Sequence, residues 1–345
     1  MTISRRTLLR IGGLTALCAA SPVQARATRE RILTDGPDVS VPAAPGRSPE
    51  WQRAVAGLRV GAASRHGSLT VFWLHGREPV PPLDVATLDE ARASGALVIV
   101  ERDRAAVPEL NVDNRGKAHV LLLAGEILVG GKQNRVLRED ILLPPLSGPR
   151  SLGVYCVEQG RWNEGRRDFE SKASFAHPGL RREVYDKADQ ARVWSEVARS
   201  TRAAAAPSPT ASYQQVYEQP AVRQHLDEAE RVLDARVDAG ALGAAVFVGA
   251  SLGGLDVFRD PSLFGREWRK LLRAYAVEAY ARPPAAPAPE VKQRAELHRL
   301  LSGAAAASGV IRGNAGVGQM FEFRLEHHRG VALSHEGAIV HAAIL

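Results

Sequence analysis

Short apolar runs recur between residues 58 and 158 and alternate with turn residues. The runs of strand length are Leu69–Leu74, Leu97–Glu101, Leu110–Val112, His119–Leu123, Ile127–Val129, Val136–Leu143 and Leu152–Val157. Asn114-Arg115-Gly116 and Gly130-Gly131 supply turn chemistry between them. This spacing predicts an antiparallel β sandwich or barrel-like unit. One helix interrupts it, because Thr87 and Glu90 form a capping box and Gly95 is placed to end the helix.

The next segment changes from strand to helix periodicity. Residues 160–178 are polar and charged with scattered aromatics, which predicts a long surface loop. Helical patterns follow at Arg181–Arg202 and Pro220–Asp238. The Ala/Pro/Ser stretch at 203–210 cannot continue a helix, so these helices form a connecting layer.

The last third returns to strands. Asp260-Pro261 marks a helix start as an N-cap followed by proline at the first helical position. The linker Pro283–Pro289 separates that helix from a second one. The other expected elements are strands at Ala244–Gly249, Gly254–Phe258, Met320–Leu325, Gly330–Leu333 and Ala338–Ile344 and a helix at Glu290–Leu301. This order indicates an α+β fold, with helices on one face of a mostly antiparallel sheet.

These patterns divide the 345 residues into successive parts. The expected parts are a signal peptide (1–25), a flexible tail (26–50), a β-rich unit (51–178), a helical connection (179–240) and an α+β unit (241–345). The length favours more than one packed unit.

The N-terminus matches a twin-arginine export signal. Arg5 and Arg6 precede an apolar stretch, Ile11–Ala20, that is too short to span a bilayer. Val23-Gln24-Ala25 meets the small-residue cleavage rule and places the mature start at Arg26. Leu17 before Cys18 does not fit a lipobox. We therefore expect a periplasmic or secreted protein with no stable membrane anchor after cleavage.

Composition and charge narrow the class of protein. Hydrophobic residues make up 45% and charged residues 24% of the chain, which is typical of globular proteins. Three of the 45 basic residues and none of the acidic ones lie in the signal, so cleavage lowers the formal charge from +7 to +4. This mild, mixed charge argues against nucleic acid as a partner. Cleavage also removes Cys18 and leaves Cys156 as the only thiol, which excludes an internal disulfide.

The densest polar motif follows the double glycine. Gly130-Gly131 permits a positive φ or a close backbone approach, and four polar side chains come directly after it, Lys132, Gln133, Asn134 and Arg135. These side chains are suited to a small polar or anionic ligand. A hairpin turn with solvated side chains explains them equally well, because the glycines lack the spacing of a phosphate-binding loop.

A second motif ends the last strand of the β-rich unit, Cys156-Val-Glu158-Gln159-Gly-Arg161-Trp162. Alternation puts Cys156 and Glu158 on one face. With a base such as His177 nearby, Cys156 has the chemistry of a nucleophile, but a lone cysteine in a strand is more often a small buried hydrophobe. Gln159, Arg161 and Trp162 are candidates to line a ligand site; stacking of Arg161 and Trp162 on each other is the alternative for those two.

Two further patterns carry less weight. His327, His328, His335 and His341 gather near the end of the chain without compact metal-ligand spacing, so we predict no metal site. The letters Gly249-Ala-Ser251-Leu-Gly253 match a nucleophile elbow, but we expect a turn between two strands there, and an elbow joins a strand to a helix.

Taken together, the segments Leu83–Leu97, Val107–Leu110, Leu121–Arg135, Cys156–Trp162 and Gly254–Phe258 resemble the ARG and Rhodanese-Phosphatase-superfamily-associated Protein domain. The resemblance covers most of the chain after Trp51, and its most specific parts are the two polar motifs. It implies association with ADP-ribosylglycohydrolase and rhodanese-phosphatase proteins and a link to ADP-ribose or phosphoester metabolism. It assigns no catalytic roles, and an export signal fits poorly with a cytoplasmic ADP-ribose context.

Three functions are compatible with these patterns. The first is an exported ligand-binding or accessory protein in which the two polar motifs meet on adjacent strands. The second is a hydrolase for a nucleotide-like or glycosidic substrate, with Glu126 or Glu158 as acid or base and Cys156 as nucleophile. The third is a structural envelope protein. Twin-arginine substrates often carry a cofactor, but no pattern identifies one here.

Overall fold

The computed structural model describes residues 44–76, 80–102, 108–163, 165–282 and 286–345. The expected signal peptide, most of the expected tail and the start of the Pro283–Pro289 linker lie outside these ranges. No helix in the described part of the chain is both long and apolar enough to cross a membrane.

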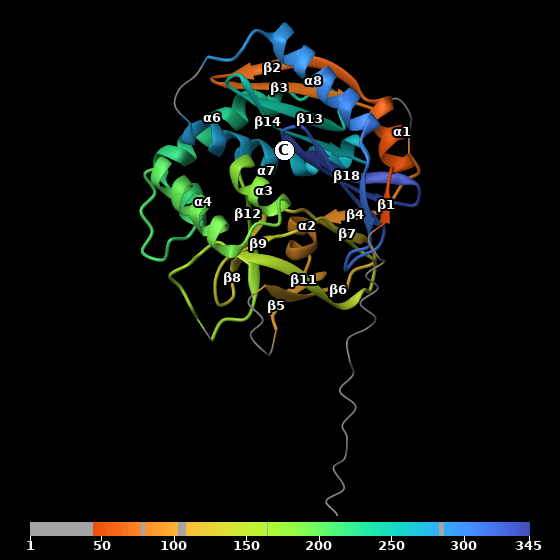
Figure 1. Ribbon diagram of the computed structural model, residues 1–345. Helices are drawn as coiled ribbons and strands as arrows, with labels where there is room; N and C mark the ends of the chain where they lie inside the picture. The colour runs from red at the N-terminus through yellow and green to blue at the C-terminus, as the bar shows by residue number, and fades with distance from the viewer. Residues whose placement is uncertain (1–43, 77–79, 103–107, 164, 283–285) are drawn as a thin grey trace, which may run out of the picture. The chain divides into compact units, whose positions relative to one another are not determined.

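A large antiparallel sheet forms the upper part of the fold in Figure 1. Its strands in spatial order are β1 (Ala44–Gly46), β15 (Gly309–Arg312), β16 (Gln319–Leu325), β17 (His328–His335), β18 (Ala338–Ile344), β14 (Ser251–Phe258), β13 (Gly243–Val248), β3 (Leu69–His75) and β2 (Arg59–His66). The central strands of the sheet are buried on both faces. In β3, Val71 and Trp73 face one hydrophobic core while Phe72 and Leu74 face another. Burial on both sides explains why β3 is a continuous apolar run.

Helices cover both faces of this sheet. On one face lie α1 (Pro49–Gly57) and α8 (Glu290–Ala306), joined by a hydrogen bond of 2.9 Å from Trp51 Nε1 to the Ala304 carbonyl. On the other face α7 (Pro261–Ala281) packs against the sheet, and α6 (Pro220–Leu233) packs against α7. The remaining helices are α2 (Leu88–Ala93), α3 (Pro178–Tyr185), α4 (Gln190–Ala203) and α5 (Gln214–Glu218).

A second, barrel-like sheet occupies the lower part of Figure 1. Its order is β12 (Phe169–Phe175), β8 (Glu126–Gly130), β9 (Arg135–Leu137), β11 (Gly148–Cys156), β6 (Glu109–Asn114) and β5 (Leu97–Glu101). The edges approach each other, because Val100 bridges Asp168 and the Glu101 N–H donates to the Arg167 carbonyl at 2.9 Å. A small sheet of β10 (Ile141–Leu143), β7 (His119–Leu122) and β4 (Val85–Thr87) completes this region, with β4 parallel to β7.

The predicted fold class, α+β with a barrel-like N-terminal part and a mostly antiparallel sheet, is confirmed. Local signals were also correct. Thr87 and Glu90 form the capping box of α2, Gly95 follows that helix at a φ of 71°, and the Asp260 side chain caps α7 by accepting from the Leu263 N–H.

Three details differ from the sequence expectations. The expected loop at 160–178 contains β12, whose alternation is hidden by a register shift and a φ of 51° at Ala173. The expected helix at 181–202 is two helices, because Asp189 starts α4 as an N-cap. The β2–β3 hairpin, placed in the N-terminal β-rich unit, pairs with β13 in the large sheet. Hairpins in distant parts of a chain can share a sheet, which local periodicity does not reveal.

A buried cluster of charges joins these layers. Arg181 of α3 donates to both oxygens of Asp256 on β14, at 3.1 and 2.6 Å, and Tyr275 of α7 donates to Asp256 at 2.6 Å. His341 of β18 lies between Asp256, at 3.3 Å, and Asp140, at 2.6 Å. Each of these side chains is almost fully buried.

The cluster is balanced in charge. Burial opposes a charged imidazole, but Asp140 and Asp256 outweigh it and raise the pKa of His341 to about 9, so the ring is protonated at neutral pH. Burial would raise the pKa of Asp256, yet Arg181 and His341 hold it well below its usual value. Two cations therefore face two anions, which is the condition under which buried charges are tolerated.

Removing one member of this cluster is expected to be costly. Asp256→Ala leaves Arg181 and His341 without their shared partner, and breaking a buried pair in this way costs about 3–5 kcal/mol. Asp238→Ala is the control, because Asp238 pairs with His75 at 3.1 Å but is 41% exposed. Its loss should cost less than about 1 kcal/mol. Urea unfolding followed by circular dichroism measures both, and equal effects of the two variants would contradict the assigned role of the cluster.

Candidate functional site

The two polar motifs meet at one end of the barrel-like sheet. The first motif forms the turn between β8 and β9, and the second continues from the end of β11. Strands β9 and β11 are antiparallel neighbours, with Arg135 directly opposite Cys156. Adjacent strands thus bring the motifs together, as the ligand-binding hypothesis required.

The double glycine is required by the shape of this turn. Gly130 and Gly131 have φ values of 129° and 53°. A Cβ on Gly131 would lie 2.1 Å from Cζ of Phe169, and one on Gly130 would lie 2.6 Å from the Asp168 carbonyl oxygen. Any larger residue therefore meets both backbone strain and a clash with the segment that leads into β12.

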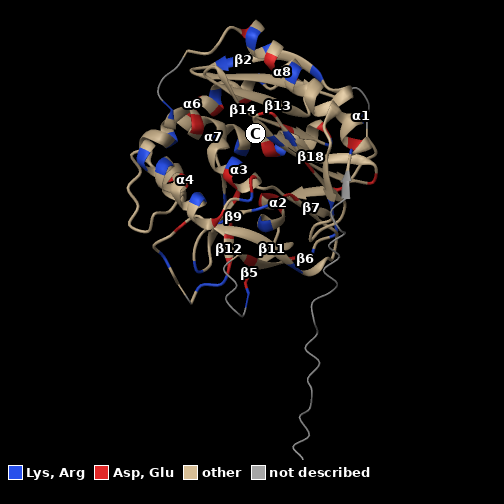
Figure 2. Ribbon diagram, in the orientation of Figure 1, with Lys and Arg blue, Asp and Glu red and all other residues tan. Residues whose placement is uncertain are grey.

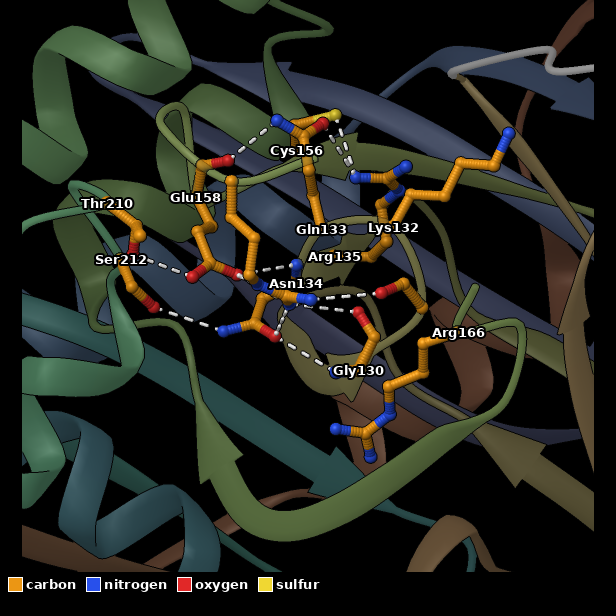
Figure 3. A network of polar contacts seen from close by, with 12 residues as sticks. Gly130, Lys132, Gln133, Asn134, Arg135, Cys156, Glu158, Arg166, Thr210 and Ser212 are labelled. Carbon is orange, nitrogen blue, oxygen red and sulfur yellow. Dashed lines mark hydrogen bonds and ion pairs between the residues drawn. The ribbon is translucent and has the colours of Figure 1, made fainter. Parts of the chain in front are cut away.

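Glu158 organises the buried side of the site, as Figure 3 shows. Its carboxylate accepts hydrogen bonds from the Asn134 N–H at 3.1 Å, Arg161 Nε at 2.8 Å and the Thr210 hydroxyl at 2.7 Å. Burial alone would raise the pKa of Glu158, but these donors outweigh it and hold the pKa below its usual value. Glu158 is therefore an ionised structural acceptor at neutral pH.

Arg161 ties the second motif to the turn. Its terminal nitrogens donate to the carbonyls of Gly131 and Gly130 at 3.0 and 3.1 Å and to the Asn134 side-chain oxygen at 2.9 Å. Asn134 in turn donates to the Ser212 hydroxyl at 3.0 Å. With its Nε bound to Glu158, Arg161 uses every nitrogen of its guanidinium to hold the turn, Asn134 and Glu158 in place.

Arg135, Cys156 and Gln133 form a deeper layer. Arg135 is fully buried and donates to the Cys156 sulfur at 3.0 Å, to the Gln133 oxygen at 3.2 Å and to Glu101 at 3.4 Å. The Gln133 amide donates to the Glu158 carbonyl at 2.8 Å. The outer end of this layer is closed by the Lys132 N–H, which donates to Glu101 at 2.8 Å.

The environment of Cys156 is not that of an activated nucleophile. Burial raises the pKa of its thiol, and Arg135 offsets only part of that effect. His177, considered as its base, instead contacts Tyr213 through Nδ1 at 3.0 Å and Glu196 and Ser200 through Nε2 at 2.8 and 3.1 Å. Ser200 and Glu196 share the same ring nitrogen, which is not the arrangement of a catalytic triad.

Lys132, Gln159 and Trp162 form the outer surface of the site, here called the Trp162 platform. The Lys132 ammonium lies 5.0 Å from the centroid of the Trp162 ring, and the Trp162 side chain is 47% exposed. Gln159, three residues before Trp162, is also exposed. The loop that continues from Trp162 into β12 carries Arg166 and Arg167, which Asp168 follows. Figure 2 shows both blue and red stretches in the loops of the lower part of the fold.

Glu126, the other candidate carboxyl, belongs to a different environment. It begins β8, at the end of the strand opposite the double glycine, and pairs with Lys270 of α7. Burial raises the pKa of Glu126 to about 8, with Lys270 opposing the shift and Glu267 and Asp89 adding to it. Glu126 and Glu158 thus take separate partners, so the pair of carboxyls in a shared cleft, which would favour a hydrolase, is not seen in the described residues.

The histidine-rich end of the chain is dispersed. His327 is 81% exposed, whereas His341 belongs to the buried charge cluster. Within the described ranges, no three His, Cys, Asp or Glu side chains are placed to hold a metal ion. Ser251 follows the tight turn between β13 and β14, so the Gly-x-Ser-x-Gly letters lie in a hairpin and not in a nucleophile elbow.

A small cavity lies beside the buried charge cluster. Its volume is about 20 Å³, and its lining includes Asp140, Tyr185, Arg138 and Arg312. This volume holds about one water molecule. The cavity is therefore too small for an organic ligand.

Sequence reasoning missed several members of both networks. Glu101, Thr210 and Ser212 lie far from the motifs in sequence, and their residue types are ordinary for a strand end and a loop. Asp256 and His341 left a clearer signal, since each is the only ionisable residue in a largely apolar strand. Such a residue must find a buried partner.

Comparison with known proteins gives one match. The family model described as the ARG and Rhodanese-Phosphatase-superfamily-associated Protein domain matches residues 57–345. No curated protein and no solved structure matches the chain. The matched range contains both polar motifs, Glu126 and the buried charge cluster.

The turn geometry leads to a matched pair of substitutions. Gly131→Ala should destabilise the protein by about 1–3 kcal/mol more than Gly67→Ala, because overpacking against Phe169 adds to the strain. Gly67 is a close control, since it has a φ of 54° against 53° for Gly131 and a Cβ there would meet no atom within 4 Å. Chemical denaturation measures the difference. Equal losses would show that backbone strain alone requires glycine at Gly131.

Proposed function

The chain belongs to the ARG and Rhodanese-Phosphatase-superfamily-associated Protein domain family, and we propose that it is a ligand-binding protein whose site is the Trp162 platform. The description of the family names an association and no reaction, so the proposal rests on the chain itself. The observation that carries it is the pairing of an exposed indole with a cation on a turn that buried hydrogen bonds fix in place.

Exposure of Trp162 is the first support. Among the described residues, the large hydrophobic side chains that are exposed are Leu146, Trp162, Val291 and Val310. Trp162 is the aromatic member of this group. Tryptophan dominates binding energy at interfaces because its large ring contributes much contact area with few rotatable bonds.

Rigidity of the platform is the second support. Arg161, next to Trp162, is anchored to Gly130, Gly131, Asn134 and Glu158. Residues held in this way lose little conformational entropy when a ligand binds, and this raises affinity without any new contact. The buried network is thus the support of the site, and the ligand contacts belong to the outer residues.

The chemistry of the platform favours a particular class of ligand. Indole faces stack on flat rings, and the Lys132 ammonium attracts an anionic group beside them. Arg166 adds a second cation on the same loop. Its side chain is 39% exposed, and its carboxylate partners among the described residues, Asp168 and Glu170, lie at 3.8 and 3.6 Å. We infer a small anionic ligand with a flat ring, such as a nucleotide.

The rival functions have less support. A hydrolase with Cys156 as nucleophile requires a lowered thiol pKa, and burial raises it. A hydrolase with Glu126 as acid requires access for substrate, and the Glu126 side chain is fully buried. A structural envelope protein needs no exposed Trp–Lys pair on a fixed turn.

Binding to the platform is testable by titration calorimetry. AMP, ADP-ribose, sugar phosphates and inorganic phosphate are titrated into the chain from Arg26. We expect a phosphate that carries a flat ring to bind. Trp162→Ala should lower the affinity about tenfold or more, since stacking of a base on an aromatic ring is worth about 1–3 kcal/mol. Lys132→Ala should lower the affinity as well.

Leu146→Ala is the control for loss of an exposed hydrophobic side chain, because Leu146 is 71% exposed and lies outside both motifs. Trp162→Phe should retain part of the affinity, as stacking requires. The proposal fails if none of these ligands binds, or if binding is unchanged in Trp162→Ala.

We also propose that the protein acts outside the cytoplasm after twin-arginine export. The support is the sequence of residues 1–25, with its arginine pair, short apolar stretch and small residues before the cleavage position. Trp162 and Lys132 would then meet ligands of the cell envelope.

Export is tested by substituting the arginine pair. Arg5→Lys with Arg6→Lys should leave the uncleaved chain in the cytoplasm, because the export machinery reads the arginines themselves. Arg10→Lys is the control, since it changes a neighbouring arginine outside the pair. Cell fractionation followed by immunoblotting gives the result, and a cleaved chain of the double variant in the periplasm would argue against this route.

A further inference from the structure

A second cluster of buried charges contains more anions than cations. Lys270 of α7 contacts Glu126 of β8, Glu267 at 2.9 Å on the same helix and Asp89 of α2 at 3.0 Å. Lys270 is 4% exposed, and Glu126 and Glu267 are completely buried. Three carboxyl groups thus share one ammonium.

The three carboxyls differ in their hydrogen-bond donors and in their exposure to solvent. Asp89 also accepts from the Ser171 hydroxyl of β12 and keeps 36% of its side chain exposed. Glu126 accepts from Lys270 and from the Leu123 N–H at 2.8 Å. Glu267 is near Lys270 but neither of its oxygens has a hydrogen bond in the described structure. If every carboxyl were ionised, a buried site would hold two uncompensated negative charges.

Among the described residues, Lys270 is the cation that is paired with these carboxyls. Arg266, which precedes Glu267 on α7, instead donates to Glu90 of α2 and to the Val85 carbonyl of β4. The groups that face the cluster are therefore Lys270 and Glu267 from α7, Asp89 from α2, Glu126 and the Leu123 N–H from the β8 region, and Ser171 from β12.

An unpaired charge in the protein interior has a large free-energy cost, and a buried carboxyl avoids this cost by taking up a proton. Like charges that share one site cannot all ionise. The raised pKa of Glu126, at about 8, agrees with this count, and its first cause is burial.

We propose that Glu126, which shares the single ammonium of Lys270 with Glu267 and Asp89, binds one proton at neutral pH, and that this proton holds α7 against the barrel-like sheet. Helix α7 packs on β13 and β14 of the large sheet, while Lys270 reaches across to Glu126 of β8 and Asp89 of α2. The cluster is a proton-dependent joint between the two sheets. It is separate from the charge-balanced cluster around Asp256 and from the Trp162 platform, and does not depend on the proposed ligand.

The direction of the pH effect follows from the site of the proton. A carboxyl that holds its proton more tightly in the folded chain contributes stability that is complete below its unfolded pKa of 4.5 and is lost as pH rises through about 8. For each proton bound in excess by the folded state, the folding equilibrium constant changes up to tenfold per pH unit in this window.

The test measures urea unfolding of the full chain between pH 5 and pH 9, in wild type and in Glu126→Gln and Glu267→Gln. The wild type should lose stability with rising pH. Glu126→Gln should lose that dependence, since a neutral amide replaces the protonated acid, and Glu267→Gln should weaken it, since it removes a negative charge that raises the pKa of Glu126. Glu290→Gln is the control, because Glu290 pairs with Arg294 at 2.9 Å on the exposed side of α8. It should keep the wild-type dependence.

Infrared spectroscopy provides a readout that a merely structural role would not change. The wild type at pH 7 should show the carbonyl band of a protonated carboxylic acid, which disappears by pH 9.5 and is absent at pH 7 from the variant that has lost the pH dependence. If Glu126→Gln does not fold, Glu267→Gln and the wild-type spectrum still decide. Absence of the band at pH 7 in the wild type, or an unchanged pH dependence in both variants, overturns the proposal.

Discussion

The fold depends on a balance of buried charges around Asp256. A single carboxylate on β14 accepts from Arg181 of α3, from Tyr275 of α7 and from His341 of β18, and His341 continues to Asp140 beside β10. Hydrophobic contact holds these layers together without fixing their register, because it is not directional. Hydrogen bonds between opposite charges do fix the register of the layers, since each donor must point at its acceptor. The relative positions of the helices and the large sheet thus follow from the few side chains that bind Asp256.

The same principle operates at the polar motifs. Arg161 and Glu158 are charged, yet their contacts are almost all with backbone groups of the turn and with Asn134, Thr210 and each other. A tight turn with two glycines in the left-handed or extended positive region is costly on its own. The charged network offsets this cost and keeps Lys132 and Trp162 outside in a defined arrangement. The charged motif residues Arg161 and Glu158 therefore support the platform from below its surface.

Many of the local elements of the fold could be predicted from the sequence, and the elements and contacts that could not be predicted were missed for physical reasons. The run Leu97–Glu101 became β5 with the same bounds, and Asp260 caps α7, because burial patterns and caps are local. Strand β12 was missed because its bulge breaks the period of two. The charge clusters could not be predicted, since the partners Asp140, Asp256 and His341 come from separate parts of the chain and meet only through long-range pairing. The meeting of the two motifs was inferable because it needs only that β9 and β11 are neighbours.

Glu126 and Glu158 show why residue type alone does not determine chemistry. Both are buried glutamates beside a motif, and sequence reasoning gave both the same role as acid or base. Glu158 accepts from three hydrogen-bond donors, one of which is the cationic Arg161, and its pKa is lowered. Glu126 shares one lysine with Glu267 and Asp89, and its pKa is raised. Burial raises the pKa of both, so the hydrogen-bond donors and charges around each carboxyl decide the direction of the net shift. Donors to Glu158 keep it an anion that supports a turn, whereas the neighbouring carboxylates of Glu126 favour its protonated form between the two sheets.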